Sequence, residues 1–139
     1  MPVPYEYSHA ANHFYEFLLE ARDTAELGST HQAYTMTQGV LQAFRRRLDF
    51  KGAILFASVL PVGLRALFVA DWDTDEPKRQ FEDRADMTKE VQALRAAHNF
   101  SPDTAIRDVA YALRRHVDET VFDSILARLP EGAVDFWKP

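Results

Sequence analysis

Residues 35–68, TMTQGVLQAFRRRLDFKGAILFASVLPVGLRALF, align with residues 104–137, TAIRDVAYALRRHVDETVFDSILARLPEGAVDFW, at a constant offset of 69 residues and without a gap. The match includes apolar, charged and helix-breaking positions. The identical pairs are Val40/Val109, Ala43/Ala112, Arg45/Arg114, Arg46/Arg115, Asp49/Asp118, Leu60/Leu129, Pro61/Pro130 and Gly63/Gly132. Because a gapless match of this kind rarely arises by chance, we interpret the two segments as copies of one structural unit.

The spacing of apolar residues predicts that each copy is helical. In the second copy, Ile106, Val109, Ala110, Leu113 and Val117 follow the i, i+3, i+4, i+7 pattern of one helix face. The matching helix of the first copy is expected over about residues 30–48. No segment shows the sustained alternation of a β-strand.

Helix ends are also marked in the sequence. Ser101 followed by Pro102 predicts the start of the basic helix in the second copy. Asp49 and Asp118 are predicted N-caps of a following short helix, and a Leu-Pro pair ends that helix in each copy because the residue before proline disfavours the helical conformation. One more apolar turn is expected after each Leu-Pro pair.

These patterns predict a single all-α domain, a helical bundle made of two similar three-helix halves with pseudo-twofold symmetry. We expect copy one over about residues 8–70, a polar linker over about 71–84 and copy two over about 85–137. The lead helices are expected over about 8–27 and 86–98.

The short helix after the aspartate differs between the copies. The first copy has Ile54, Leu55 and Val59 where the second has Asp123, Ser124 and Arg128. A helix that is apolar nearly all round is normally buried all round. We therefore expect these three residues to be covered either by the aromatic N-terminal segment or by a partner chain, and both alternatives remain open.

Composition excludes several classes of protein. The chain of 139 residues has no cysteine, which excludes disulfides, thiolate zinc sites and cysteine nucleophiles. Its net charge of −5 argues against nonspecific nucleic-acid binding. No apolar run approaches the roughly 20 residues of a membrane span, and the N-terminus lacks the features of a secretory signal. We expect a cytoplasmic protein that binds neither nucleic acid nor membrane.

The segment VLQAFRRRLDFKGAILFASVLPVGLRALF, followed by Asp71-Trp72-Asp73, resembles the bacterial domain-of-unknown-function family 2267. The resemblance rests on the basic helix end at Arg45–Leu48, the Ala-Ser-Val-Leu-Pro break at 57–61, the LRxLF turn at 64–68 and the linker Trp72. The second copy repeats these features more loosely. The resemblance implies a compact all-helical fold, and it implies no established activity, cofactor or catalytic residue.

Two groups of residues are candidate ligand sites. His9, His13 and Glu16 share one side of a predicted helix, and two imidazoles with a carboxylate suit zinc or ferrous iron. The simpler interpretation is a set of exposed polar residues. Arg45, Arg46, Arg114 and Arg115 are candidates for an anion clamp between the halves, because arginine binds phosphate and carboxylate groups with two hydrogen bonds. The simpler interpretation here is compensation of the helix dipole together with local ion pairs.

The linker also resembles a calcium loop, with Asp71, Asp73, Asp75 and Glu82 at the first, third, fifth and twelfth positions. Its sixth position is Glu76 rather than the glycine that the turn requires, so we interpret it as a solvated acidic linker.

No catalytic motif or glycine-rich phosphate loop is present, and no cofactor is predicted. The leading hypothesis is a non-enzymatic protein-interaction or regulatory module that forms a homodimer or binds another protein through Ile54, Leu55 and Val59. The alternative is a small-ligand (anion) or metal-binding helical protein with its site between the halves, and for this alternative enzymatic activity is left open.

Overall fold

The computed structural model describes residues 3–139 and places only helices and connecting segments among them. The first half contains α1 (Tyr5–Ser8), α2 (Ala10–Thr24), α3 (Thr30–Arg45), α4 (Phe50–Ala57) and α5 (Val62–Val69). The second half contains α6 (Arg84–Ala93), a single 3-10 turn η1 (Ala96–His98), α7 (Ala105–Arg114), α8 (Glu119–Leu126) and α9 (Ala133–Phe136). The predicted all-α fold is confirmed. No helix in the described part of the chain is both long and apolar enough to cross a membrane.

The helices of the two halves end at corresponding residues. Helices α3 and α7 end at Arg45 and Arg114, and α4 and α8 correspond at both ends at the offset of 69. Soon after α2 and α6 the chain adopts the left-handed conformation at Glu26 (φ 57°) and Arg95 (φ 49°), which are again 69 residues apart. This agreement is consistent with two copies of one unit. The apolar turn expected after each Leu-Pro pair forms the short helices α5 and α9.

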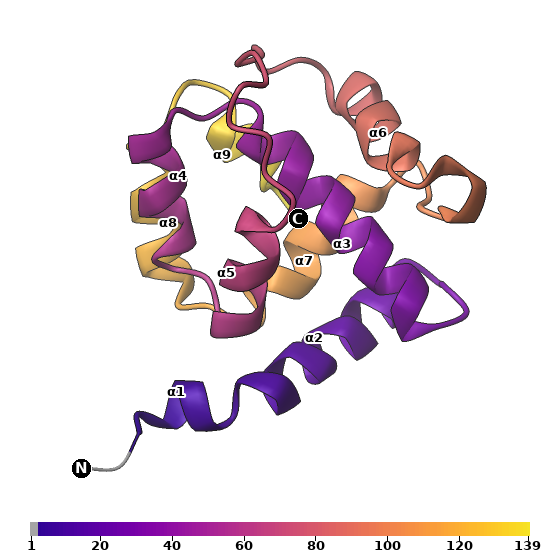
Figure 1. Ribbon diagram of the computed structural model, residues 1–139, viewed down its shortest axis with the longest axis vertical. Coiled ribbons are helices and arrows are strands. Elements are labelled where there is room, and N and C mark those ends of the chain that lie inside the picture. The colour runs from indigo at the N-terminus through magenta and orange to yellow at the C-terminus, as the bar shows by residue number, and fades with distance from the viewer. Residues whose placement is uncertain (1–2) are drawn as a thin grey trace.

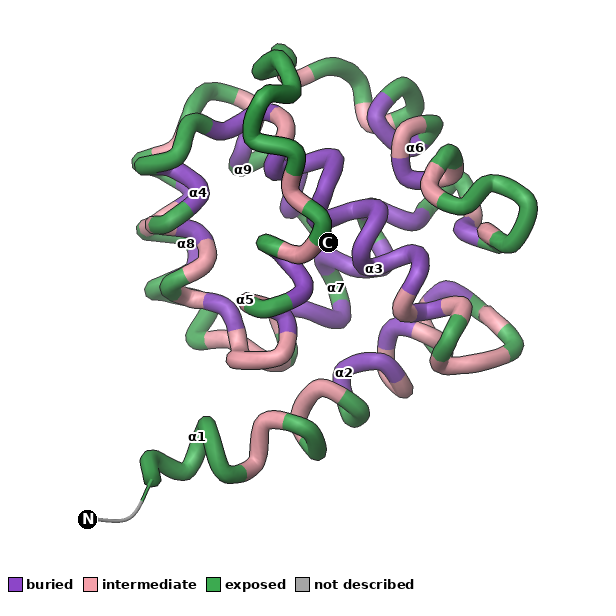
Figure 2. Tube along the Cα trace, in the orientation of Figure 1, coloured by how far each residue is buried: buried purple, intermediate pink, exposed green. Residues whose placement is uncertain are grey.

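Helix α3 runs through the middle of the molecule and is the helix buried on nearly every side (Figures 1 and 2). Every residue from Thr35 to Arg45 is buried, and the helix packs against α2, α5, α6 and α7. Two of its buried polar side chains have partners from other segments: Gln38 donates to Asp71 and accepts from Arg95, and Arg45 donates to the carbonyls of Phe68 and Ala70. Tertiary contacts therefore bury a helix of mixed composition.

Helix α4, which the sequence suggested would be buried all round, lies instead at one edge of the molecule beside α8 (Figure 1). Only Gly52, Ala53 and Phe56 of this helix are buried within the chain.

The predicted aspartate caps are confirmed in both halves. Asp49 accepts a hydrogen bond from the backbone N–H of Gly52 at 2.7 Å, and Asp118 accepts one from Val121 at 3.2 Å. Ser29 caps α3 in the same way, accepting from the N–H of Gln32 at 3.2 Å. Each cap satisfies an N–H group that has no partner within the first helical turn.

The predicted Ser101 cap is wrong. Helix α7 begins at Ala105, and the Ser101 hydroxyl is buried without a hydrogen-bond partner in the described structure. The reason is a set of hydrogen bonds between this segment and α6. The Asn99 side chain accepts from the N–H of Ser101 at 2.9 Å and also donates to the carbonyls of Val91 and Leu94. These bonds hold the segment before α7 in an extended path against α6.

The core is rich in aromatic side chains drawn from both halves. Phe56 of α4 lies 5.8 Å from Phe122 of α8 between ring centroids, and Phe44 of α3 lies 5.4 Å from Trp137. All four side chains are essentially inaccessible to solvent. Such pairs add about 0.5–1.5 kcal/mol each beyond the burial of their surface. The two halves therefore share one hydrophobic interior.

Each lead helix is also tied to the basic helix of the other half. Arg47, which follows α3, pairs with Glu90 of α6. At the matching position after α7, His116 Nε2 lies 3.2 Å from a carboxylate oxygen of Glu20 on α2, although the geometry is not that of a hydrogen bond. Arg115 donates to the same Glu20 oxygen at 3.2 Å. The halves are thus joined by charged contacts as well as by the shared core.

Candidate functional site

The first candidate arginine, Arg45, is held inside the protein by backbone carbonyls. Its Nη1 donates to the carbonyls of Phe68 at 2.8 Å and Ala70 at 3.1 Å, at the end of α5. The guanidinium carbon lies 5.0 Å from the ring centroid of Trp72. Burial, and after it the charge of Arg46, lowers the pKa of Arg45 from its ordinary value, but an arginine remains cationic. Arg45 therefore terminates α5 and supports the linker.

Arg114 makes the matching contact in the second half. Its Nε donates to the carbonyl of Trp137 at 2.9 Å, the same relationship that joins Arg45 to Phe68. The Arg114 guanidinium also lies 3.0 Å from a carboxylate oxygen of Asp123 and 3.3 Å from one of Glu119. The positive charge of Arg114 is therefore compensated by acidic side chains of α8.

The remaining two arginines pair with carboxylates on other segments. Arg46 donates to Glu76 of the linker at 2.7 Å and lies 3.4 Å from Glu90 of α6. Arg115 pairs with Glu20 of α2. No residue in the described structure is bonded by both arginine pairs, so the structure does not gather Arg45, Arg46, Arg114 and Arg115 around one common site.

The candidate metal residues lie at the N-terminal end of the molecule. The rings of His9 and His13 are 6.1 Å apart between centroids, and the ring of Tyr5 stacks on His9 at 3.8 Å. The Nδ1 atom of His9 is within hydrogen-bond distance of the Ser8 hydroxyl at 2.9 Å. Within residues 3–139 no three His, Asp or Glu side chains are arranged to hold a metal ion, and Glu16 does not complete such a group.

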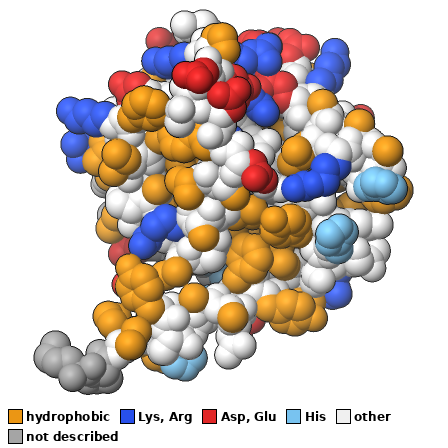
Figure 3. Space-filling model, in the orientation of Figure 1, with side chains coloured by type: hydrophobic (Ala, Val, Ile, Leu, Met, Phe, Trp, Pro, Cys, Tyr) orange, Lys and Arg blue, Asp and Glu red, His pale blue; other side chains and the backbone are white. Residues whose placement is uncertain are grey.

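The candidate interface residues have unequal exposure. Ile54 is 70% exposed, whereas Leu55 and Val59 are half-buried. Ile54 lies in a broad, open and mainly apolar depression that it forms with Ala57 of α4 and with three apolar residues of α5, namely Val62, Ala66 and Val69, and Arg65 also borders it. We call this surface the α4–α5 face. Figure 3 shows that hydrophobic side chains occupy much of the view that includes it, whereas charged side chains gather at the top of that view.

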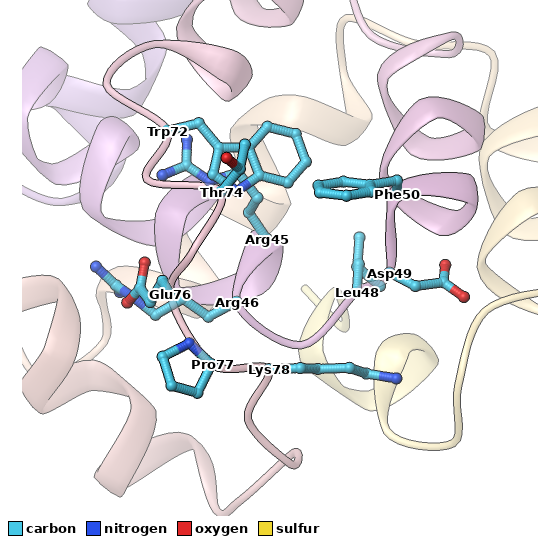
Figure 4. Close-up of a pocket in the computed structure, with 10 residues that line it drawn as sticks. All are labelled: Arg45, Arg46, Leu48, Asp49, Phe50, Trp72, Thr74, Glu76, Pro77 and Lys78. Atoms are coloured by element: carbon cyan, nitrogen blue, oxygen red, sulfur yellow. The ribbon is translucent and has the colours of Figure 1, made fainter.

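A second surface feature was not predicted from the sequence. It is a hollow of about 230 Å³ between the end of α3, the start of α4 and the linker. Its apolar walls come from Leu48, Phe50, Trp72 and Pro77 (Figure 4). Its charged neighbours are Arg45, Arg46, Asp49, Glu76 and Lys78. We call it the Trp72 hollow.

The aromatic pair of the Trp72 hollow is held in a fixed arrangement. Phe50 and Trp72 meet edge to face with their ring centroids 5.6 Å apart, and Phe50 remains 59% exposed. The cap made by Asp49 fixes the backbone that carries Phe50, and Arg45 supports the indole of Trp72 from within. One sequence signal was available: a phenylalanine directly after a helix cap and a tryptophan within an acidic linker are both unusual positions for large apolar side chains.

The fold and these surfaces define an all-helical domain with an exposed apolar face on α4 and α5 and a small aromatic hollow at the linker. Residues 14–136 match the family described as uncharacterized conserved protein (DUF2267), and the chain belongs to this family. The resemblance inferred from the sequence is therefore confirmed. A comparison with curated proteins gives no match.

Proposed function

We propose that this protein is a non-enzymatic interaction module whose α4–α5 face binds a second copy of the same chain. The observation that carries the proposal is the 70% exposure of Ile54 within an apolar surface. An apolar patch on a soluble protein commonly marks an interaction site. In this proposal the two halves are copies of one unit, and only the first copy kept the apolar residue at this position, since the second has Asp123.

The N-terminal helix α1 supplies the argument for a second copy as the partner. None of its residues is buried: Tyr5 and Tyr7 are 67% and 50% exposed, and Val3, just before the helix, is 63% exposed. Figure 1 shows α1 extending away from the other helices. Tyr7 borders the α4–α5 face, yet Ile54 stays open. Two uncovered apolar surfaces that lie next to each other can cover one another in a twofold pair, in which each N-terminal helix crosses the face of its partner.

The charges near the face are complementary in such a pair. Arg65 donates to the carbonyls of Ala57 and Leu60 but forms no ion pair with a carboxylate in the described structure. Glu6 of α1 also forms no ion pair there. In a twofold pair the Glu6 carboxylate of one copy is available to the Arg65 guanidinium of the other. This pairing would fix the orientation of the two copies more than it would add affinity.

The test is the molar mass in solution, measured by size-exclusion chromatography with light scattering over a range of protein concentrations. We expect a dimer for the native chain and a monomer for Ile54→Asp. This substitution introduces the residue that the second copy already carries at the matching helical position, so α4 is expected to fold. The control is Val121→Asp, an exposed valine on α8 outside the face, which should leave the dimer intact. A native chain that stays monomeric at high concentration, or a dimer unaffected by Ile54→Asp, would refute the proposal.

A further inference from the structure

We propose that the Trp72 hollow is a binding site for a single-ring aromatic carboxylate. This site is distinct from the proposed contact between copies and does not depend on it. The size of the hollow, the nature of its walls and the charges around it all match such a ligand.

The size limits the ligand. An apolar protein cavity of about 150 Å³ accommodates benzene. The Trp72 hollow, at about 230 Å³, has room for one aromatic ring with a short substituent, and is smaller than the pockets that hold drug-sized molecules. A ligand with two fused rings and a long side chain would extend beyond it.

The walls favour an aromatic group. The side chains of Phe50 and Trp72 present ring edges and faces at a fixed angle, and Leu48 adds an aliphatic surface (Figure 4). Phe50 is more than half exposed although it is a large apolar side chain. A ring placed against this pair gains aromatic contacts and removes the exposed Phe50 surface from water.

The residues that line the hollow include three cations, Arg45, Arg46 and Lys78, and two carboxylates, Asp49 and Glu76. Arg46 is neutralised by Glu76 at 2.7 Å, and one Asp49 oxygen accepts the N–H of Gly52. Neither Lys78 nor Arg45 forms an ion pair with a carboxylate in residues 3–139. Lys78 lies along the rim of the hollow (Figure 4). An ammonium at the rim of an apolar hollow matches a ligand whose ring enters the hollow and whose carboxylate stays at its edge.

The two tryptophans make the site directly observable. Trp72 is partly exposed in the hollow, whereas Trp137 is fully buried in the core. In a two-dimensional ¹H–¹⁵N NMR titration with phenylacetate, we expect a saturable shift of the Trp72 indole N–H signal and no shift of the Trp137 signal. Benzyl alcohol, which has a ring without the charge, should bind at least about tenfold more weakly than phenylacetate. Acetate, which has the charge without the ring, should produce no saturable shift.

Variants of the hollow test separately how much the aromatic wall and the Lys78 charge contribute to binding. Phe50→Ala and Lys78→Met should each weaken phenylacetate binding about tenfold or more, and Lys51→Met is the matched control because Lys51 is exposed on α4 outside the hollow. Asp49→Asn keeps a capping side chain but removes a nearby negative charge, so it should tighten binding. Thermal unfolding followed by circular dichroism verifies that each variant is folded.

A titration without a saturable Trp72 shift would overturn the proposal. Equal binding of phenylacetate and benzyl alcohol, unchanged by Lys78→Met, would also overturn it, because the site would then not recognise the carboxylate. Full binding by Phe50→Ala would show that the ligand lies elsewhere.

Discussion

Arg47 and Glu90 form a two-point ion pair across the contact between α3 and α6. Nη1 of Arg47 donates to one carboxylate oxygen at 2.8 Å, and Nη2 donates to the other at 2.5 Å. The Arg47 side chain is fully buried, and that of Glu90 is 14% exposed. Arg47 also donates to the carbonyls of Ala43 and Gln80. The pair therefore links α3, α6 and the linker at a single buried point.

Substitution of Glu90 by glutamine is expected to destabilise the fold strongly. It removes the closest counter-charge of the buried Arg47 and leaves only the more exposed Glu82 carboxylate, at 3.5 Å. Removal of one partner of a buried pair typically costs about 3–5 kcal/mol. We expect a loss of about 3 kcal/mol in the free energy of unfolding, measured by urea denaturation. Glu82→Gln is the control, because Glu82 lies farther from Arg47, at 3.5 Å, and is more exposed than Glu90. This substitution should cost about 1 kcal/mol or less. Equal effects of the two substitutions would contradict the central role of Glu90.

The same pair predicts how stability changes with acidity. Burial alone would raise the pKa of Glu90, but the hydrogen bonds and charge of Arg47, assisted by Arg79 and Arg46, outweigh burial and hold that pKa below its ordinary value. A carboxyl group with a lowered pKa in the folded state stabilises the fold above its unfolded pKa of about 4.3, and this contribution is lost as the pH falls through the folded pKa.

The difference in unfolding free energy between the native chain and Glu90→Gln should therefore be constant from about pH 7 to pH 5. It should shrink at more acidic pH as Glu90 takes up a proton. Urea denaturation of both proteins at several pH values measures it. A difference that begins to shrink well above pH 5 would mean that burial dominates and the pKa is raised.

Local chemistry predicted much of this fold from the sequence, and contacts between distant segments explain what it missed. The caps at Asp49 and Asp118, and the ends of α4 and α8 shortly before the Leu-Pro pairs, depend on neighbouring residues, so they could be predicted. The burial of Arg47 depends on Glu90, which lies 43 residues away in the sequence. Nothing in the sequence Arg45-Arg46-Arg47 indicates that Arg47 is buried whereas Arg46 is partly exposed.

The candidate sites show the same division. The exposed Ile54 could be singled out because the matching residue of the second copy is charged. The Trp72 hollow could not be predicted, because it requires the linker to fold back over the start of α4 and bring Trp72 against Phe50. The placement of a linker depends on tertiary contacts such as the one between Arg46 and Glu76.

The two serines that precede basic helices should respond differently to alanine. Ser29→Ala removes a cap to the N–H of Gln32 and should cost about 1 kcal/mol of stability. Ser101→Ala removes a buried hydroxyl that has no hydrogen-bond partner in the described structure, so it should be neutral or slightly stabilising. Chemical denaturation of both variants tests this. A cost for Ser101→Ala equal to that for Ser29→Ala would mean that Ser101 has a capping role that the structure does not show.

Gly39 sets the distance between α3 and α6, and its replacement by alanine is expected to destabilise the protein. An added Cβ would lie 2.9 Å from the backbone oxygen of Val91 and 3.0 Å from its side chain, so α6 would have to move. In an exposed helix, alanine is favoured over glycine by about 1 kcal/mol, whereas overpacking of a well-packed interior costs about 1–3 kcal/mol. Since the clash involves backbone, which cannot rotate away, we expect a net loss of about 1–2 kcal/mol by urea denaturation. The control is Gly28→Ala, where the added Cβ would make an ordinary contact with Gln32 and stability should change little. A stabilised Gly39→Ala variant would show that α6 can shift away from α3 at little cost, and would count against a rigid contact held by Arg47 and Glu90.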